Sequence, residues 1–214
     1  MNMNMRGAEL KKRTVDQFTA EANSYDDTYK MVSGDYPEIV AELESEPFRN
    51  LLDCGCGTGA VLSLLHERCP DKELTGIDIT PKMIDVAKSK ALPNVEYVVG
   101  DCENLPFPEE SFDVVVCSHS FHHYPSPQDF FNSARRVLVP GGRLILRDNT
   151  GSILFLLKSN LYTLPKLRRR DKLGDVRFYS LRQVRRFCER AGLKVEKLEE
   201  RATHKLHCVA RKPL

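Results

Sequence analysis

The stretch LLDCGCGTGA (residues 51–60) joins an apolar run to an acid and then to three glycines at alternate positions. The apolar run predicts a buried strand, and the pattern that begins at Ala60 predicts a helix, so the glycines fall in the turn between them. Glycines in such a turn let the backbone approach a ligand closely and direct the helix N–H groups toward it. The turn therefore predicts a ligand site. Its spacing also satisfies a dinucleotide fingerprint, so the turn alone does not identify the ligand.

Short apolar runs and helical patterns alternate through the next hundred residues. Near-continuous apolar runs such as VVVC (114–117) indicate strands that are covered on both faces, as in a parallel sheet. This alternation predicts an α/β doubly wound sheet with right-handed crossovers. The predicted strands are 49–54, 73–79, 95–101, 112–120 and 142–148, and the predicted helices between them are 60–69, 81–91 and 126–138.

Both ends of the chain depart from this alternation. The first 45 residues predict one or two helices that precede the sheet. Residues 180–192 predict a capped helix that ends at Gly192. The segments 193–200 and 204–212 could then pair as a hairpin, which would add an antiparallel edge to the parallel sheet.

The composition is that of an ordinary soluble protein with one sizeable core. The chain has 214 residues, of which 41% are hydrophobic and 29% charged, and its net charge of +2 does not favour a nucleic-acid partner. Seven irregularly spaced cysteines do not predict a disulfide framework, and Cys54-x-Cys56 lacks a second pair or a nearby histidine, so no metal site is expected. No secretory signal or membrane span stands out, which predicts a cytoplasmic protein.

A carboxylate stands at or near the end of each of the first three predicted strands. Asp53 would repel a pyrophosphate but attract an ammonium group. Asp78 can accept hydrogen bonds from ribose hydroxyls, and Asp101 can accept one from the exocyclic amine of a purine. Because parallel strands end at one edge of the sheet, these groups suit a ligand that combines an amino acid, a ribose and an adenine. They suit a ligand that carries phosphates poorly.

Four blocks of the sequence, in this order, carry a family resemblance: LLDCGCGTGA (51–60), TGIDIT (75–80), GDCENLPFPEESFDVVVCSHSFHHYPSP (100–127) and RVLVPGGRLIL (136–146). The chain resembles the class I S-adenosylmethionine-dependent methyltransferases, in their small-molecule (type 11, ubiquinone/menaquinone-biosynthesis-like) branch. The resemblance covers roughly residues 10–212 and implies a Rossmann-like seven-stranded sheet, mostly parallel with an antiparallel last strand, in a three-layer α/β/α sandwich.

The resemblance also implies an organisation and a set of cofactor contacts. We expect a single methyltransferase domain, 1–214, made of an N-terminal helical cap (1–45), a cofactor-binding half (46–148) and a substrate-side part (149–214) with an insertion, the last helix and the hairpin. The methionine moiety is assigned to the turn, the ribose to the end of the second strand, the adenine to the end of the third, and the sulfonium to the end of the fourth. The implied cofactor-binding residues are Asp53, Gly55, Cys56, Gly57, Gly59, Asp78, Ile79, Met83, Asp101, Cys102 and Ser118.

Candidate catalytic residues follow the fourth strand. The segment SHSFHHYP (118–125) lies where family enzymes place groups that face the substrate, and it contains His119, His122 and His123. An imidazole can accept a proton near neutral pH, which a methyl acceptor needs only if it must lose one. His119 and His122 are the histidines that we select, and His119 is nearest the strand end. Tyr25, in the segment TAEANSYDDTY (19–29), is a third candidate because related sequences cover the cofactor with such a segment; packing of a helix would explain this tyrosine equally well.

The segment 149–175 is the most individual part of the chain. Its apolar half could line an apolar substrate pocket, and its basic run KLRRRDK (166–172) could meet an anionic substrate or remain solvated. The apolar residues concerned are Ile153, Leu154, Phe155, Leu157, Leu161 and Tyr162.

The leading hypothesis is a methyltransferase that acts on a small molecule, uses S-adenosylmethionine and releases S-adenosylhomocysteine. A second hypothesis is a methyltransferase acting on RNA or protein, although Cys117-Ser118-His119-Ser120 stands where enzymes that modify nucleic-acid amino groups carry a [DN]-P-P-[YF] pattern. A third is an NAD-dependent oxidoreductase, which Asp53 disfavours, and a fourth is a non-catalytic binding module of the same fold.

Overall fold

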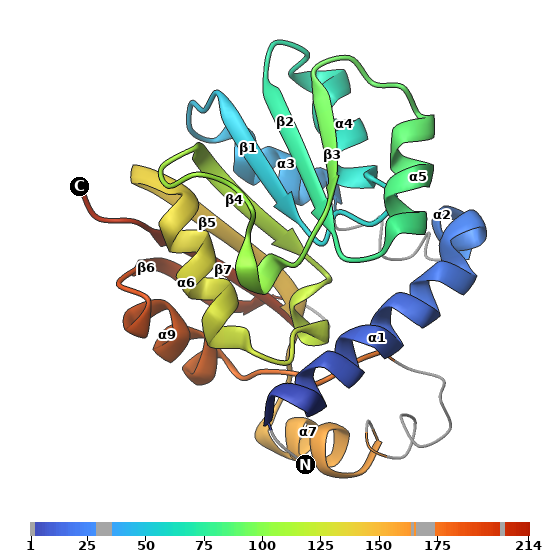
Figure 1. The fold of residues 1–214 in the computed structure, drawn as a ribbon. Coiled ribbons are helices and arrows are strands. Elements are labelled where there is room, and N and C mark those ends of the chain that lie inside the picture. Colours follow the sequence, from blue (N-terminus) through green and yellow to red (C-terminus); the bar gives the residue numbers. More distant parts are fainter. Residues whose placement is uncertain (1–2, 29–35, 164, 166–173, 202–203) are drawn as a thin grey trace.

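The computed structural model describes residues 3–28, 36–163, 165, 174–201 and 204–214. Within them, one seven-stranded sheet has the order β3-β2-β1-β4-β5-β7-β6. The first five strands are parallel, and β7 pairs antiparallel with both β5 and β6 (Figure 1). The predicted fold class is therefore confirmed, and so is the hairpin. The strands are β1 (Asn50–Cys54), β2 (Glu73–Asp78), β3 (Val95–Val99), β4 (Phe112–Ser118), β5 (Leu138–Asn149), β6 (Lys194–Arg201) and β7 (Lys205–Arg211).

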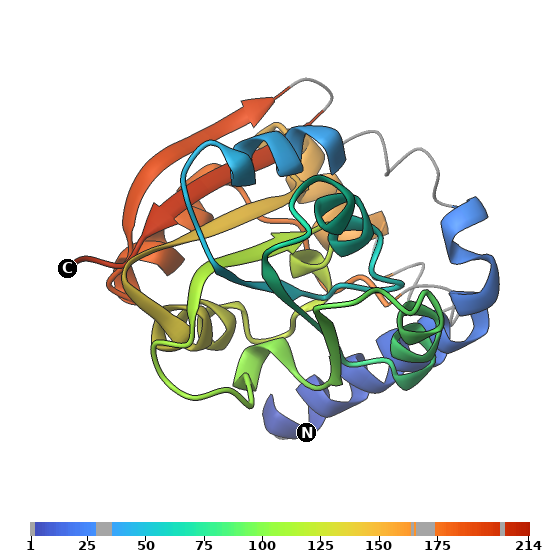
Figure 2. The ribbon, with the colours of Figure 1, turned by 90° about the horizontal axis from the view of Figure 1, so that it is seen from above.

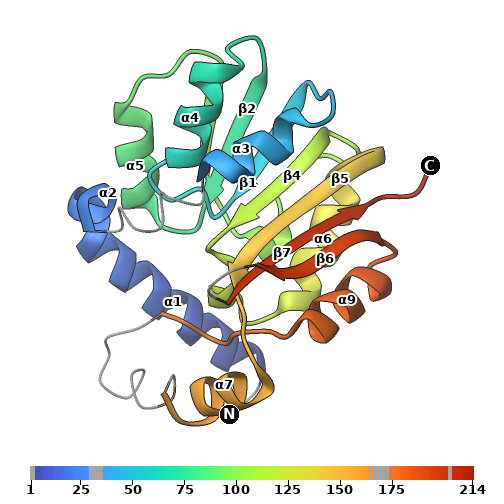
Figure 3. The ribbon, with the colours of Figure 1, turned by 180° about the vertical axis from the view of Figure 1, so that it is seen from behind.

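Helices cover both faces of the sheet, as Figure 1 and its reverse view, Figure 3, show. Figure 2 shows the sheet between the two layers from above. The α-helices are α1 (Met3–Glu21), α2 (Tyr25–Thr28), α3 (Tyr36–Glu44), α4 (Ala60–Arg68), α5 (Pro81–Ser89), α6 (Pro127–Val137), α7 (Ile153–Lys158) and α9 (Leu181–Arg190); the short 3₁₀ helices are η1 (Ala22–Ser24), η3 (Cys102–Asn104) and η4 (Phe121–His123), and η5 (Ser159–Thr163) is a π-helix.

Alternate residues of the central strands supply two separate cores. Leu51 packs with the side chains of α3, α4 and α5, whereas its neighbour Leu52 packs with those of α6 and α9. Both leucines are fully buried, because successive side chains of a strand point to opposite faces and both faces are covered here. The continuous apolar runs in the sequence have this cause.

The helices on the α6 face begin at residues that favour helix starts. Pro127 stands in the first turn of α6, where its missing N–H costs no hydrogen bond. Ser180 and Gln183 form a reciprocal capping box at the start of α9. These local signals set the helix starts close to the predicted ones.

Two regions differ in detail from the predicted elements. The strand predicted at 142–148 begins earlier, because β5 starts directly after α6 at Leu138 and includes Pro140, Gly141 and Gly142. Its pairing with β4 shifts register there, and Gly141 has a φ of 80°. The apolar residues of 149–163 form α7 and η5, but they are mostly exposed, with Ile153 at 78% and Leu154 at 76%. The basic run 166–172 lies outside the described residues.

In the part of the chain that the structure describes, no helix combines the length and the apolar character that a membrane span requires.

Arg143, at the start of β5's regular pairing, joins the sheet to the end of α3. Its side chain is 3% exposed, and its guanidinium donates to the carbonyl oxygens of Leu43 (2.7 Å), Glu46 (3.1 Å) and Glu42 (3.3 Å). The last carbonyls of a helix have no partners within the helix. Arg143 therefore supplies donors that the end of α3 would otherwise lack.

We expect Arg143→Leu to lower the free energy of unfolding by about 2–4 kcal/mol, because it leaves buried carbonyl groups without donors. Urea unfolding followed by circular dichroism measures this change. The matched control is Arg49→Leu, which removes a 78% exposed arginine paired with Glu73 and should cost at most about 1 kcal/mol. Equal losses in the two variants would contradict the role assigned to Arg143.

Candidate active site

The glycine turn connects β1 to α4 through three residues with left-handed backbone. Gly55, Gly57 and Gly59 have φ values of 73°, 53° and 77°, which side chains other than glycine's adopt with strain. A Cβ on Gly55 would lie 1.8 Å from the hydroxyl of Ser120, and one on Gly59 would lie 2.5 Å from that of Tyr97. A Cβ on Gly57 would meet no protein atom within 4 Å. The turn is thus packed against protein at two glycines and faces open space at the middle one.

Asp78, the last residue of β2, fixes this turn. One carboxylate oxygen accepts a hydrogen bond from the Gly57 N–H (3.0 Å), and the other accepts one from the Thr80 N–H (2.8 Å). Burial raises the pKa of Asp78, although these two hydrogen bonds oppose the shift. The carboxylate predicted to hold a ribose therefore also holds the turn that precedes α4.

Asp53 is buried beside the same space. The residue is only 2% exposed, and burial followed by repulsion from Asp78 raises the pKa of Asp53 to about 7. The buried Asp53 and the half-buried Asp78 repel one another when both are charged, because burial strengthens their interaction. A cation that entered the site would relieve this repulsion.

Two small cavities of about 50 and 40 Å³ adjoin the turn and have Gly55, Asp78 and His123 in common. We call them the turn cavity and the Asp101 cavity. Every predicted cofactor-binding residue except Gly59 lines one of them. The turn cavity is lined by Asp53, Gly55, Cys56, Gly57, Asp78, Met83 and Ser118, and the Asp101 cavity by Gly55, Asp78, Ile79, Asp101 and Cys102. The structure brings these residues together, and their individual roles stay predictions.

Ser118 stands at the end of β4 and lines the turn cavity. Its hydroxyl is buried and has no hydrogen-bond partner among the described residues. Buried hydroxyls are normally hydrogen-bonded, so an orphaned one beside a cavity indicates a ligand that completes it.

The Asp101 carboxylate is already engaged by α1. Its Oδ2 lies 2.6 Å from the Lys11 ammonium, which also contacts Glu103, and its Oδ1 accepts a hydrogen bond from the Glu103 N–H (2.9 Å). Lys11, Thr14 and Phe18 all line the Asp101 cavity. Sequence reasoning missed these three residues, yet their spacing of three and four puts them on one face of a helix, which could have identified them.

The three histidines after β4 occupy different environments. His119 lines the turn cavity and has a φ of 52°. Its backbone N–H donates to the Arg147 carbonyl (2.8 Å). His122 lines neither cavity; its Nδ1 bonds to Asp148 (2.7 Å). Although burial opposes it, the Asp148 carboxylate raises the pKa of His122 to about 9. His119 therefore lies where a base could reach an acceptor, and His122 does not.

His123, which we did not select, lines both cavities. Burial and the neighbouring His122 lower its pKa to about 3, so the ring is neutral at physiological pH. Only the folded loop distinguishes His123 from His122, because adjacent residues in a sequence carry no signal of which one faces a cavity.

Tyr25 lines the turn cavity, together with Phe18 and Tyr36. The rings of Tyr25 and Phe18 meet edge to face at 5.9 Å. The segment 19–29 thus reaches the cavity at Tyr25, while its last residue, Tyr29, lies outside the described residues.

A larger cavity of about 790 Å³ is also lined by Lys11 and Asp101. Leu161 lines it, but Ser118 and His119 do not.

Asp53→Asn tests the charge of this site through stability. Between the ordinary carboxyl pKa near 4 and the raised value of about 7, the folded protein holds a proton that the unfolded chain releases. The stability due to this proton is full below about pH 4 and is lost as the pH rises through 7.

We therefore expect the wild-type free energy of unfolding to fall between pH 5 and pH 8 by about 3 kcal/mol more than that of Asp53→Asn. At pH 8 the variant should be the more stable protein. Urea titrations at the two pH values measure both quantities, with Asp85→Asn, an exposed residue of α5, as the control. Parallel pH dependence in wild type and Asp53→Asn would show that Asp53 is not buried with a raised pKa.

Comparison with known proteins places the chain in a family. The family model described as "Methyltransferase domain" matches residues 52–146. A demethylmenaquinone methyltransferase of Thermotoga maritima is 32% identical over 150 residues, which are 66% of this chain and 64% of that protein, so the match spans less than two thirds of that relative. A malonyl-[acyl-carrier protein] O-methyltransferase of Hahella chejuensis is 31% identical over 197 residues, which are 89% of this chain and 67% of that one.

A solved structure, a SAM-dependent methyltransferase from Aquifex aeolicus, has the same fold. It superimposes with a TM-score of 0.69 at 21% identity, covering 90% of this chain and 97% of its own. The glycine turn and the strand-end carboxylates lie within the region that the family model matches. The chain therefore belongs to the class I S-adenosylmethionine-dependent methyltransferases, in the branch that this methyltransferase domain defines.

Proposed function

We propose that this protein transfers the methyl group of S-adenosylmethionine to a small-molecule acceptor by in-line displacement and releases S-adenosylhomocysteine. When bound, S-adenosylmethionine supplies a methyl group on a positively charged sulfur that leaves readily as a neutral thioether. The protein's part is then mainly to bind and orient, which can lower a barrier by about 7–11 kcal/mol in favourable cases.

The charge of the turn cavity carries this proposal. Among the described residues that line it, two are carboxylates, Asp53 and Asp78, and none is a lysine or arginine. A diphosphate would be repelled there, whereas an ammonium or sulfonium group would be attracted. The open space at Gly57 and the orphaned Ser118 hydroxyl fit the same ligand.

The acceptor side of the proposal rests on the residues near Ser118. Phe18, Tyr25 and Tyr36 give the turn cavity an aromatic wall, and His119 adds an imidazole. Such a wall favours a planar or apolar acceptor, with His119 able to take a proton from a hydroxyl group. The relatives named for demethylmenaquinone and for malonyl-[acyl-carrier protein] support methyl transfer but differ in their acceptors.

Ligand binding tests the cofactor directly. A ligand present at 100 times its dissociation constant stabilises the folded state by about 2.7 kcal/mol. We expect S-adenosylmethionine and S-adenosylhomocysteine to raise the melting temperature and NADH to leave it unchanged. Calorimetric titration of Asp53→Asn should show S-adenosylmethionine affinity reduced by about 30- to 100-fold, the loss of one charged interaction, while Asp85→Asn binds as wild type does.

The variant Asp53→Asn is informative because it is expected to be more stable than wild type near neutral pH, so weaker binding cannot be attributed to unfolding. Stabilisation by NADH in preference to the adenosyl ligands would overturn the proposed function.

His119 is tested through turnover. A panel of phenols, quinols and carboxylic acids is assayed for release of S-adenosylhomocysteine, and His119→Asn is compared on the acceptor that reacts. Asparagine tolerates the positive φ of this position, so the change removes the imidazole with little strain. Loss of a general base should lower kcat by about 10²- to 10⁴-fold without changing the affinity for S-adenosylmethionine. An equal fall in both would mean that His119 shapes the cofactor site instead.

A further inference from the structure

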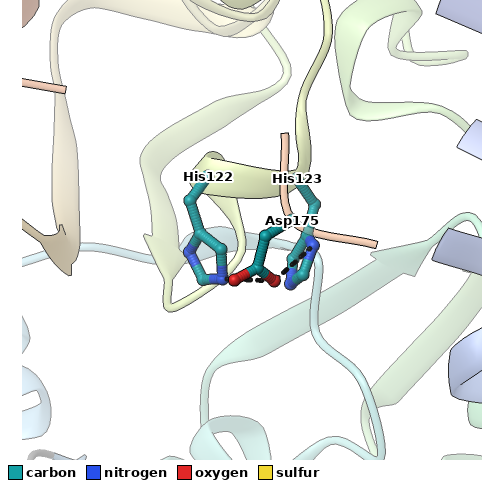
Figure 4. A group of neighbouring side chains, drawn as sticks. All are labelled: His122, His123 and Asp175. Carbon is teal, nitrogen blue, oxygen red and sulfur yellow. Dashed lines mark ion pairs between the residues drawn. The ribbon is translucent and has the colours of Figure 1, made fainter. Parts of the chain in front are cut away.

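Three potential metal ligands converge beside the loop that follows β4. His122 and His123 come from η4, and Asp175 comes from the segment that precedes α9 (Figure 4). The two parts are joined through the backbone, because the N–H groups of Val176 and Arg177 donate to the His122 carbonyl at 2.9 and 3.1 Å. The position of Asp175 beside the histidines is therefore set by main-chain hydrogen bonds.

The spacing of the three ligand atoms fits one ion. Oδ1 of Asp175 lies 3.7 Å from His122 Nε2 and 3.5 Å from His123 Nδ1, and all three atoms lie within 4.8 Å of one another. These two distances are long for hydrogen bonds. Ligands at about 2.0–2.2 Å in a tetrahedral arrangement are about 3.4 Å apart. Binding would require the most widely spaced pair of ligand atoms to approach by up to about 1.4 Å, the difference between 4.8 Å and 3.4 Å.

His122 is held in the orientation of a metal ligand. Its Nδ1 bonds to Oδ1 of Asp148 (2.7 Å), and Oδ2 of Asp148 accepts a hydrogen bond from the backbone N–H of His122 (2.9 Å). A histidine that binds a metal through one nitrogen generally donates its other N–H to a carboxylate or carbonyl, which fixes the ring. The bond to Asp148 leaves Nε2 of His122 directed at Asp175, as Figure 4 shows.

His123 provides an independent sign of an absent partner. The residue is 8% exposed, and its Nδ1 is buried without a hydrogen-bond partner among the described residues. This nitrogen lies 3.5 Å from the Asp175 carboxylate without a hydrogen bond, and a buried nitrogen in this state costs free energy that a bound ion would recover. The ring is edge to face with Phe18 at 5.1 Å and lines both cavities of the active site.

We propose that His122, His123 and Asp175 bind a divalent transition-metal ion of the zinc type, with Asp148 as the residue that orients His122. Two imidazoles and one carboxylate suit such an ion, and three protein ligands leave a fourth position for a water or another small ligand. The ion would clamp residues 174–177 to the loop after β4, next to a wall of the cofactor site. The proposal does not depend on which acceptor is methylated.

Metal binding by the full chain, without a histidine tag and freed of metal by chelation, tests this proposal. Calorimetric titration with Zn²⁺ should show one tight equivalent, and Co²⁺ should give the visible absorption of a tetrahedral site. Asp175→Asn and His123→Gln each remove one ligand while keeping the side-chain shape, and each should weaken Zn²⁺ binding by more than tenfold. Asp148→Asn, which removes the orienting carboxylate, should weaken it by about 10- to 100-fold.

The control is His204→Gln, an exposed histidine paired with Glu200 outside the cluster, which should bind Zn²⁺ as wild type does. Circular dichroism establishes that each variant is folded. Zn²⁺ should also raise the melting temperature of wild type and not that of Asp175→Asn. If wild type binds no equivalent of Zn²⁺ or Co²⁺, or if Asp175→Asn and His123→Gln bind as tightly as wild type, the proposal fails and the cluster is an ion-pair network alone.

Discussion

The hydrogen bond from the Gly57 N–H to the Asp78 carboxylate is the contact on which the site depends. It ties the turn after β1 to the end of β2, so that a left-handed backbone segment is held open rather than collapsing onto the sheet. The same carboxylate adds negative charge to the turn cavity, and its repulsion, after burial, raises the pKa of Asp53 beside it. Asp78 thus holds the backbone of the turn and favours a ligand of positive charge in the turn cavity.

The sheet and the cofactor side of the site could be predicted from sequence because their signals are local. The apolar runs of the parallel strands reflect burial on both faces, and the glycines at 55, 57 and 59 are the residues that a left-handed turn requires. Parallel strands also end at a common edge, so carboxylates at strand ends meet without any further knowledge of the fold. The start of β5 escaped prediction because a proline and two glycines at 140–142 usually mark a turn. Here the flanking Leu138 and Arg143 pair with β4, and Gly141 and Gly142 exchange backbone hydrogen bonds with Lys212.

The other side of the site depends on contacts between distant parts of the chain. Lys11 reaches Asp101 from the first helix, and Asp175 reaches His122 and His123 from a segment near the last helix. Neither pairing leaves a pattern in one sequence, since the residues are far apart and each is unremarkable by itself. The expectation of no metal site rests on the spacing of the cysteines alone. It does not consider His122 and His123, which approach Asp175 only in the folded chain.

The Lys11 contact also bears on how the cleft exchanges its contents. The ammonium and the Asp101 carboxylate are 25% and 35% exposed, and α1 lies across the carboxyl ends of the strands (Figure 1). The same ammonium pairs with Glu103, whose side chain is only 4% exposed, and the Thr14 hydroxyl donates to the Gly174 carbonyl. The first helix is therefore held over the strand ends by several contacts, and any ligand of the Asp101 carboxylate has to compete with the Lys11 ammonium for it.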